Sequence, residues 1–118
     1  MADSLGQGDA AVRLVRDERG LALVGDGMEL RGDFSRMLPR LRQGRLQQEL
    51  LVKAARIKGA EAPTAVDCTA GLGEDSLLLA AAGFTVTLFE RDQTIAALLA
   101  DALIRAAADP RLAEVVGR

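Results

Sequence analysis

The stretch VDCTAGLGED at positions 66–75 holds the residues of this sequence that are best suited to binding a small ligand. Gly71 and Gly73 allow a tight turn and a close approach of a ligand to the backbone. Glu74 and Asp75 place two carboxylates where a helix would begin and expose its free N–H groups. Negative charge at that point repels a pyrophosphate and attracts a ligand that carries positive charge.

Two classes of ligand compete for such a loop. A dinucleotide site needs the pattern G-x-G-x-x-G, and Ser76 stands where the third glycine would be. S-adenosylmethionine carries a sulfonium and an ammonium, and carboxylates attract both positive charges. It also carries a ribose diol, whose hydroxyls can donate hydrogen bonds to an acid after the next strand. Asp67 and Glu90 occupy positions that fit these two roles. The residues therefore favour S-adenosylmethionine and leave a nicotinamide or flavin cofactor as an alternative.

The same residues also have purely structural interpretations. The two glycines could form a plain turn, and the two acids after them could complement the dipole of the helix. Asp67 could cap its own loop, Thr69 could bond to the loop backbone, and Glu90 could be a solvated loop acid. Cys68 is expected to be a small buried residue, because no base lies near it in the sequence.

The elements around this loop alternate. The sequence predicts a short buried strand at 64–68, a helix from 74 or 75 to 83, a strand at 84–89 and a helix at 93–108. Asp92 is suited to cap the last helix, and Asp109-Pro110 is suited to end it. Strand–helix–strand–helix at this spacing predicts βαβ units and a parallel sheet, so an α/β fold is expected.

The part of the chain before this unit has a different pattern. Residues 12–31 show short apolar runs between turn signals, which predicts a small antiparallel β meander. Residues 32–45 are polar, basic and interrupted by glycine and proline, so an exposed connector is expected there. Residues 47–57 have near-helical apolar spacing. We therefore divide the chain into 1–58 (meander, basic connector and helix) and 59–118 (parallel strands with helices).

Composition excludes several kinds of site. The chain has 118 residues, 49% hydrophobic and 27% charged, which is ordinary for one globular domain. Histidine, tryptophan and tyrosine are absent, which excludes His-based zinc sites, Ser-His or Cys-His pairs and Trp or Tyr stacking platforms. We expect no signal peptide in the acidic start and no membrane helix, and a single cysteine fits a cytoplasmic location.

Charge is unevenly spread along the chain. The net charge is −2, yet residues 31–58 carry eight Lys and Arg residues and two acids, a local sum of +6. A basic segment between two acidic ones indicates a local anionic partner, and a solvated helix face is the alternative.

Several segments together resemble the ribosomal small-subunit methyltransferase J family. They are DCTAGLGED at 67–75, FERD at 89–92, and AALL and DALIRA at 96–99 and 101–106, with weaker upstream matches at 20–24, 30–34, 44–45 and 53–59. The resemblance covers about residues 12–112. It implies the first half of a Rossmann-like class I S-adenosylmethionine methyltransferase domain, preceded by the small antiparallel β segment.

The resemblance also implies an activity and a set of contact residues. The activity is transfer of a methyl group from S-adenosylmethionine to the exocyclic N2 of a guanine in 16S ribosomal RNA of the small ribosomal subunit. In that family, the pair after the second loop glycine and the pair that ends the second strand contact the cofactor. By position these are Glu74 and Asp75, and Glu90 and Arg91. With Asp67, Gly71 and Gly73 they form the predicted cofactor site.

The sequence departs from the family at four points. One is the stretch RQGR at 42–45, a thinner version of a Gly-rich basic segment that the family often has before its first long helix. Glu74 stands where the family usually has a basic residue, and Cys68 where it usually has alanine. Family members are longer, and an Asp-Pro motif in a later strand holds the target amine. The Asp109-Pro110 pair of this chain follows a helix and is expected to be only a helix stop. We therefore expect a catalytically incomplete chain with no catalytic residue and no metal site. Such a chain should either pair with a second copy through an exposed sheet edge or be marginally stable.

Phosphate contacts are expected from the basic connector. The candidates for RNA binding are Arg36, Arg40, Arg42 and Arg45. Two other functions stay open, namely a non-catalytic interaction module that keeps the fold and a fragment of a nicotinamide-dependent oxidoreductase.

Overall fold

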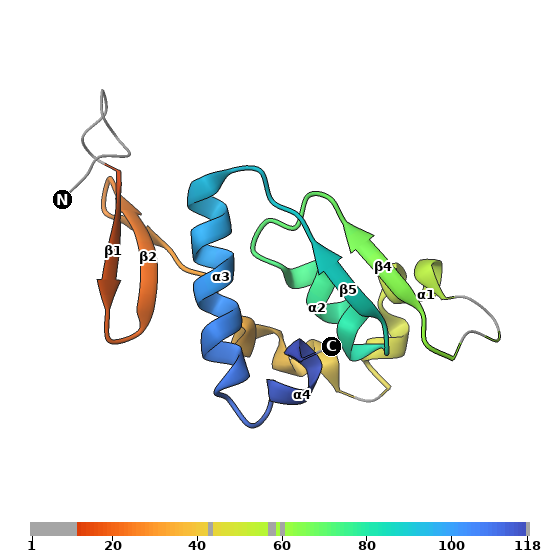
Figure 1. Cartoon of the computed structure of the whole chain (residues 1–118). Coiled ribbons are helices and arrows are strands. Elements are labelled where there is room, and N and C mark those ends of the chain that lie inside the picture. The colour runs from red at the N-terminus through yellow and green to blue at the C-terminus, as the bar shows by residue number, and fades with distance from the viewer. Residues whose placement is uncertain (1–11, 43, 57–58, 60, 118) are drawn as a thin grey trace.

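The computed structural model describes residues 12–42, 44–56, 59 and 61–117. The molecule is elongated, with extents of 52 × 26 × 21 Å along its principal axes. Figure 1 shows N-terminal strands at one end, a long helix beside them, and a second pair of strands with further helices toward the other end. No helix among these residues has both the length and the apolar character that crossing a membrane requires.

The predicted antiparallel meander is confirmed. It consists of β1 (Arg13–Asp17), β2 (Gly20–Gly25) and β3 (Met28–Leu30), in the order β1-β2-β3. Asp26 and Gly27 between β2 and β3 both have positive φ angles, of 50° and 73°. Two consecutive positive φ values make the primed turn that suits a two-residue hairpin, and Asp-Gly readily adopts it.

The segment predicted as an exposed connector is a 3₁₀ helix, η1 (Phe34–Leu41), and part of it is buried. Its N-cap Asp33 accepts hydrogen bonds from Ser35 N at 3.0 Å and from Ser35 Oγ at 2.6 Å. Phe34 and Met37 lie in the core. Side chains three residues apart share one face of a 3₁₀ helix, so these two pack inward although basic residues surround them in sequence. The prediction was wrong because glycine, proline and arginine obscured this spacing.

The helix predicted at 47–57 is divided into two short pieces. The 3₁₀ turn η2 (Leu46–Gln48) precedes α1 (Leu50–Ala55), and Glu49 separates them with an extended backbone. Val52 is buried and holds α1 to the core. The end of the predicted helix lies outside the described residues.

The predicted strand–helix–strand–helix order is confirmed. Its elements are β4 (Thr64–Asp67), α2 (Glu74–Ala81), β5 (Thr85–Leu88) and α3 (Gln93–Ala107). The two strands pair in parallel, with Asp67 opposite Leu88 at their carboxyl ends. α2 is the crossover between them, as parallel neighbours require.

Both ends of α3 follow the predicted signals. The Asp92 carboxylate accepts hydrogen bonds from Thr94 N at 2.9 Å and from Ile95 N at 3.1 Å, so it caps the first turn. The helix ends before the Asp109-Pro110 turn, which confirms the predicted stop. The short helix that follows, α4 (Ala113–Val116), was not predicted, and it packs against α2 and α3.

The core contains residues from both predicted parts of the chain and lies on one side of the parallel strands. Its members include Phe34, Met37, Val52, Leu77, Leu78, Leu99, Ala102 and Leu112. The other face of the strands is open, because Val66 is 62% exposed and Phe89 is 56% exposed. Two predictions are corrected here, since β4 is only half-buried and Cys68 is exposed. Successive strand residues point to opposite faces, and among the described residues helices cover only one of them.

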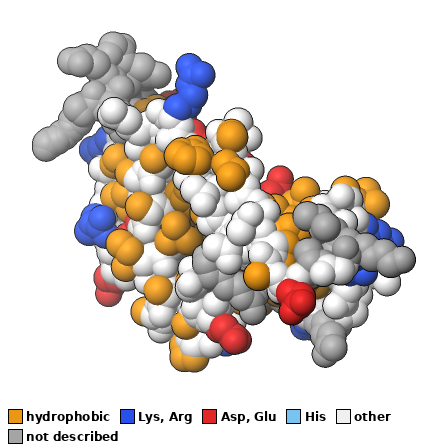
Figure 2. All heavy atoms as spheres, turned by 45° about the vertical axis from the view of Figure 1, so that its right-hand side comes forward, with side chains coloured by type: hydrophobic (Ala, Val, Ile, Leu, Met, Phe, Trp, Pro, Cys, Tyr) orange, Lys and Arg blue, Asp and Glu red, His pale blue; other side chains and the backbone are white. Residues whose placement is uncertain are grey.

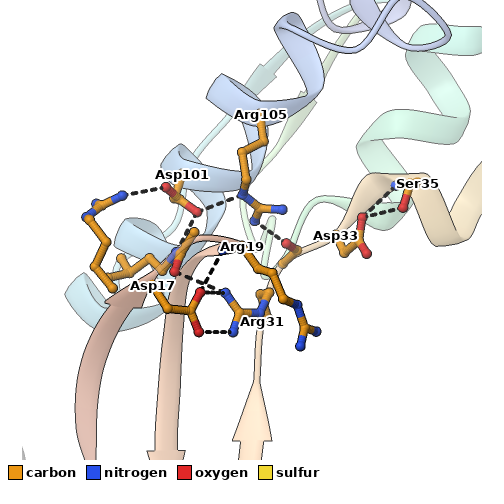
Figure 3. A network of polar contacts seen from close by, with 11 residues as sticks. Asp17, Arg19, Arg31, Asp33, Ser35, Asp101 and Arg105 are labelled. Atoms are coloured by element: carbon orange, nitrogen blue, oxygen red, sulfur yellow. Dashed lines mark hydrogen bonds and ion pairs between the residues drawn. The ribbon is translucent and has the colours of Figure 1, made fainter.

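The N-terminal sheet is attached to α3 by a polar cluster (Figure 3). Asp101 of α3 is only 7% exposed and accepts hydrogen bonds from Leu21 N, Arg16 and Arg105. Arg105 also donates a hydrogen bond to the carbonyl oxygen of Gly32. Gly20 is required at this contact, because a Cβ there would lie 2.6 Å from Asp101 Oδ2. The sheet and α3 are thus joined by side chains and not by strand pairing.

Candidate functional site

The predicted site residues meet at the carboxyl ends of β4 and β5. Phe89 N donates a hydrogen bond to Asp67 O at 2.8 Å, and Ala70 N donates to Phe89 O at 3.0 Å. The loop after β4 is therefore bonded to the loop after β5. In open parallel sheets, ligands bind outside the carboxyl ends of the strands, which is where these loops lie.

Positions 71 and 73 of the loop are glycine for different structural reasons. Gly73 has a φ of 84°, and a Cβ there would lie 2.8 Å from Leu99 Cδ1 and 2.9 Å from Phe34 Cζ. Both its conformation and its close packing therefore require glycine. Gly71 also has a positive φ, of 57°, but a Cβ there would meet nothing within 4 Å. The backbone at Gly71 thus borders open space, in which a ligand can approach.

Asp67 is used within its own loop. One carboxylate oxygen accepts a hydrogen bond from Thr69 N at 3.1 Å, and the other accepts one from Ser76 Oγ at 2.7 Å. Ser76 is buried at the position of the third glycine of a dinucleotide site. Asp67 therefore orders the loop between β4 and α2, which agrees with its structural interpretation.

Glu90 links the two loops. Its Oε1 accepts a hydrogen bond from Gly71 N at 2.8 Å, and its Oε2 accepts one from Asp92 N at 3.0 Å. The side chain is half-buried beside the open space at Gly71. A carboxylate oxygen can accept more than one hydrogen bond, so these contacts leave capacity for a hydroxyl donor.

The acids at the start of α2 differ from each other. Both lie in the first turn and are exposed, and the N-cap Gly73 has no side chain to cap that turn. Glu74 Oε2 lies 3.8 Å from Arg36 Nη2 of η1. Asp75 forms no ion pair within the described part of the chain, and Arg91 is exposed and forms none there either. Asp75 therefore provides the less compensated negative charge beside the loop.

The four predicted RNA contacts have different surroundings. Arg40 forms a bidentate ion pair with Glu49, at 2.9 Å from Nε and 2.7 Å from Nη2. This pairing raises the pKa of Arg40 and lowers the pKa of Glu49. The pKa of Arg40 is raised first by Glu49 and also by the nearby charges of Glu74 and Asp75, so η1 lies beside the start of α2. Basic and cofactor candidates are thus neighbours, although Arg40 is already paired.

Further hollows lie among the described residues. An apolar cavity of about 40 Å³ lies on the core side of β5, where Gly73 and Ser76 line it together with Leu77, Val86 and Leu88. A polar hollow of about 160 Å³ lies between η1 and the end of α3, where Asp33, Arg105 and Arg111 are found. Within the described ranges, no three His, Cys, Asp or Glu residues are grouped so that they could hold a metal.

Sequence reasoning missed the roles of two polar residues. Ser76 was noted only as the replacement of a third glycine, and the structure shows that it bonds to Asp67. Asp101 holds the N-terminal sheet, and its signal was a single acid in an Ala- and Leu-rich run with Arg105 one helical turn later. A polar residue on an apolar helix face is buried only when it finds partners, and those partners come from distant parts of the chain.

Comparison with known proteins agrees with this arrangement. The family model for SAM-dependent methyltransferases matches residues 6–118. The chain is 45% identical over 111 residues to ribosomal RNA small subunit methyltransferase J of Thioalkalivibrio sulfidiphilus (strain HL-EbGR7), covering 89% of this chain and 44% of that protein. It is 40% identical over 119 residues to the protein of the same name from Chromohalobacter salexigens, covering 96% of this chain and 46% of that protein. The chain thus spans less than half the length of these curated relatives.

A solved structure has the same fold. The crystal structure of a SAM-dependent methyltransferase from Neisseria gonorrhoeae matches with a TM-score of 0.71 and 30% sequence identity, covering 91% of this chain and 44% of that one. The expected Rossmann-like half-domain with a preceding antiparallel segment is therefore confirmed. The match of the family model over nearly the whole chain places this protein in the SAM-dependent methyltransferase family that includes ribosomal RNA small subunit methyltransferase J.

Proposed function

We propose that this chain is the cofactor-binding part of a methyltransferase that uses S-adenosylmethionine to methylate N2 of a guanine in 16S ribosomal RNA. The observation that carries the proposal is the Glu90 carboxylate, which lies 2.8 Å from Gly71 N at the carboxyl ends of two parallel strands. An acid after the second strand is placed to accept hydrogen bonds from the hydroxyl groups of a ribose. The names of the similar proteins supply the class of acceptor.

The acids of the crevice support a cationic ligand. Asp75 is exposed at the start of α2, where its charge attracts the ammonium or sulfonium of S-adenosylmethionine. Glu74 lies beside Arg36, so its charge is partly compensated and it contributes less. Asp67 acts by holding Ser76 and the loop, and Arg91 lies at the open rim after β5. A pyrophosphate at the same place would be repelled by two carboxylates, which disfavours a nicotinamide cofactor.

We expect this chain alone to bind the cofactor without turnover. Bound S-adenosylmethionine supplies an electrophilic methyl group, and Glu90, Asp75 and the Gly71 backbone orient it. Attack by a guanine amine also requires groups that hold the amine in line with that methyl group. We assign no such residue to this chain, which covers 44% of a curated relative.

Isothermal titration calorimetry with S-adenosylmethionine and with NAD tests the proposal. We expect saturable heat with S-adenosylmethionine and none with NAD. Glu90→Gln replaces one acceptor oxygen with an amide nitrogen. It should weaken binding by a factor of about 10 to 150, since a hydrogen bond to a charged group contributes about 1.5–3 kcal/mol. Glu18→Gln, at an exposed turn of the N-terminal sheet, is the matched control and should bind like the parent chain.

The opposite results have clear meanings. Saturable binding of NAD would favour the oxidoreductase alternative. Equal affinity of the Glu90→Gln variant and the parent chain would remove Glu90 from the cofactor site. Failure of a folded chain to bind either ligand would favour a non-catalytic module.

A further inference from the structure

Four exposed cationic side chains of the described residues lie in and around α1. Arg42, Arg45, Lys53 and Arg56 are exposed, and none of them forms an ion pair within the residues that the structure describes. We call these four residues the α1 surface. In Figure 2, Lys and Arg side chains are visible at the right-hand end of the molecule, the end where Figure 1 places α1.

Local geometry brings the four residues to one region. Arg45 N donates a hydrogen bond to Arg42 O at 3.0 Å, so these two lie in one tight turn that leads into η2. Lys53 lies in the last turn of α1 and Arg56 is the C-cap residue that follows it, and both side chains are exposed. The buried Val52 packs α1 against the core. The exposed cations of this region therefore remain open to solvent.

The ion pair of Arg40 with Glu49 joins this region together. It ties the end of η1 to the residue just before α1, and the charge of Arg45 also lies close enough to lower the pKa of Glu49. The guanidinium of Arg40 is already paired with the carboxylate of Glu49, so the charge of Arg40 is compensated. Glu49 is the acid closest in sequence to α1, and its charge is compensated as well. The four cations of the α1 surface therefore keep their charges without an ion-pair partner in the described part of the chain.

We propose that the α1 surface is where this chain docks the phosphate backbone of RNA, and that Arg40 positions this surface instead of contacting RNA. The inference rests on the proposed function. Exposed cations that form no ion pair among the described residues are complementary to a polyanion. A membrane is disfavoured, because α1 has six residues and a single strongly exposed large apolar side chain, Leu50.

The location of the α1 surface also favours an RNA substrate. Arg40 feels the charges of Glu74 and Asp75, and Arg36 lies 3.8 Å from Glu74. η1, which precedes the α1 surface in the chain, thus borders the start of α2, where the proposed methyl donor binds, and α1 itself packs against α2. RNA that runs from the α1 surface along η1 would therefore reach the donor crevice.

The salt dependence of RNA binding tests the proposal. Fluorescence anisotropy would follow a labelled single-stranded RNA of about 20 nucleotides binding to the full chain. Four phosphate contacts predict a slope of log K against log salt of about −3, or about a 50-fold loss between 50 and 200 mM. The double variants Lys53→Gln/Arg56→Gln and Arg42→Gln/Arg45→Gln should each reduce this loss to about sevenfold.

Two control variants make the result specific. Arg40→Gln/Glu49→Gln removes the ion pair without changing the net charge, and it should lower the melting temperature but keep the slope. Arg13→Gln/Arg19→Gln removes two cations from the N-terminal sheet and should keep both binding and slope.

Several outcomes would overturn the proposal. They are a slope unchanged in both α1-surface variants, a slope that falls when Arg40 is replaced, and no binding of RNA by the parent chain at 50 mM salt. Binding of phosphatidylserine vesicles, but not of RNA, with loss in the same variants would assign the surface to a membrane instead. Calorimetry with S-adenosylmethionine is read separately, so failure of the cofactor site and failure of the RNA surface are distinguishable.

Discussion

The Asp101 carboxylate accepts a hydrogen bond at 2.9 Å from the backbone nitrogen of Leu21, 80 residues earlier in the chain. β3 pairs with β2 only from Leu23 onward, so the Leu21 N–H has no strand partner on that side. Arg31 has the corresponding role for the carbonyl oxygen of Gly20, to which it donates at 3.0 Å. Side chains thus replace a missing stretch of strand, and the sheet is held to α3, the helix that begins beside the proposed cofactor crevice.

Asp101→Asn is expected to destabilise the chain. The amide keeps the shape of the side chain but removes the negative charge that pairs with Arg16 and Arg105. It also replaces one acceptor oxygen with an NH₂ group, which then faces a buried N–H donor. The expected loss is about 1–3 kcal/mol in the free energy of unfolding, measured by urea denaturation. Asp26→Asn, at an exposed turn with a φ that asparagine accepts, is the matched control and should change little. Equal stability of the two variants would mean that this cluster is not stabilising.

Stability is expected to fall in acid. Burial alone would raise the pKa of Asp101, but hydrogen bonds from Leu21 N, Arg105 and Arg16 outweigh it and lower the pKa. The pKa of Asp109 is lowered to about 2, chiefly by a hydrogen bond from the Arg111 side chain. Lowered carboxyl pKa values stabilise the folded state above the unfolded pKa of about 4, and this stabilisation is lost as the pH falls toward the folded values.

The acid effect can be measured by thermal unfolding between pH 7 and pH 2. The melting temperature should be nearly flat above about pH 5 and should drop below about pH 4. The Asp101→Asn variant should start lower and fall less steeply, because it lacks one of the groups that must be protonated. A parallel fall in variant and parent chain would mean that other carboxyls dominate.

Alanine substitutions at the two loop glycines should have different effects, one mainly on the stability of the fold and the other mainly on cofactor binding. Gly73→Ala meets Leu99 and Phe34 at less than 3 Å and has an unfavourable φ, so it should cost about 2–4 kcal/mol of stability. Gly71→Ala meets no atoms and should cost only about 1 kcal/mol, but its methyl group enters the open space beside Glu90. Gly71→Ala should therefore weaken S-adenosylmethionine binding, measured by calorimetry on folded protein. Unchanged affinity would place the ligand away from this loop.

The open face of the parallel strands should promote association between copies. β4 and β5 form a two-stranded sheet in the described part of the chain, and Val66 is 62% exposed on its outer face. We expect sedimentation velocity to show concentration-dependent dimers, which Val66→Thr weakens by making this face more polar. The matched control Val24→Thr lies in the N-terminal sheet and should leave the dimer intact. A monomer at all concentrations would contradict this expectation.

Much of the fold could be predicted because it depends on near neighbours in sequence. Asp92 caps a helix that starts one residue later, and Asp26-Gly27 makes a turn from its own backbone preferences. The alternation of strand and helix is likewise a local pattern. The 3₁₀ helix η1 could not be predicted from its composition, because Phe34 and Met37 become core residues only when α2 and α3 pack against them.

By itself, the sequence determined that a glycine turn with acids would lie at the carboxyl ends of two parallel strands. Periodicity and turn residues decide that, and both act over a few positions. Only the tertiary structure decided what each acid and arginine contacts. Asp67 bonds to Ser76, Glu90 to Gly71, Arg40 to Glu49 and Asp101 to Leu21. The reason is that a charged side chain takes the nearest partner in space, and packing brings residues up to 80 positions apart within hydrogen-bond distance.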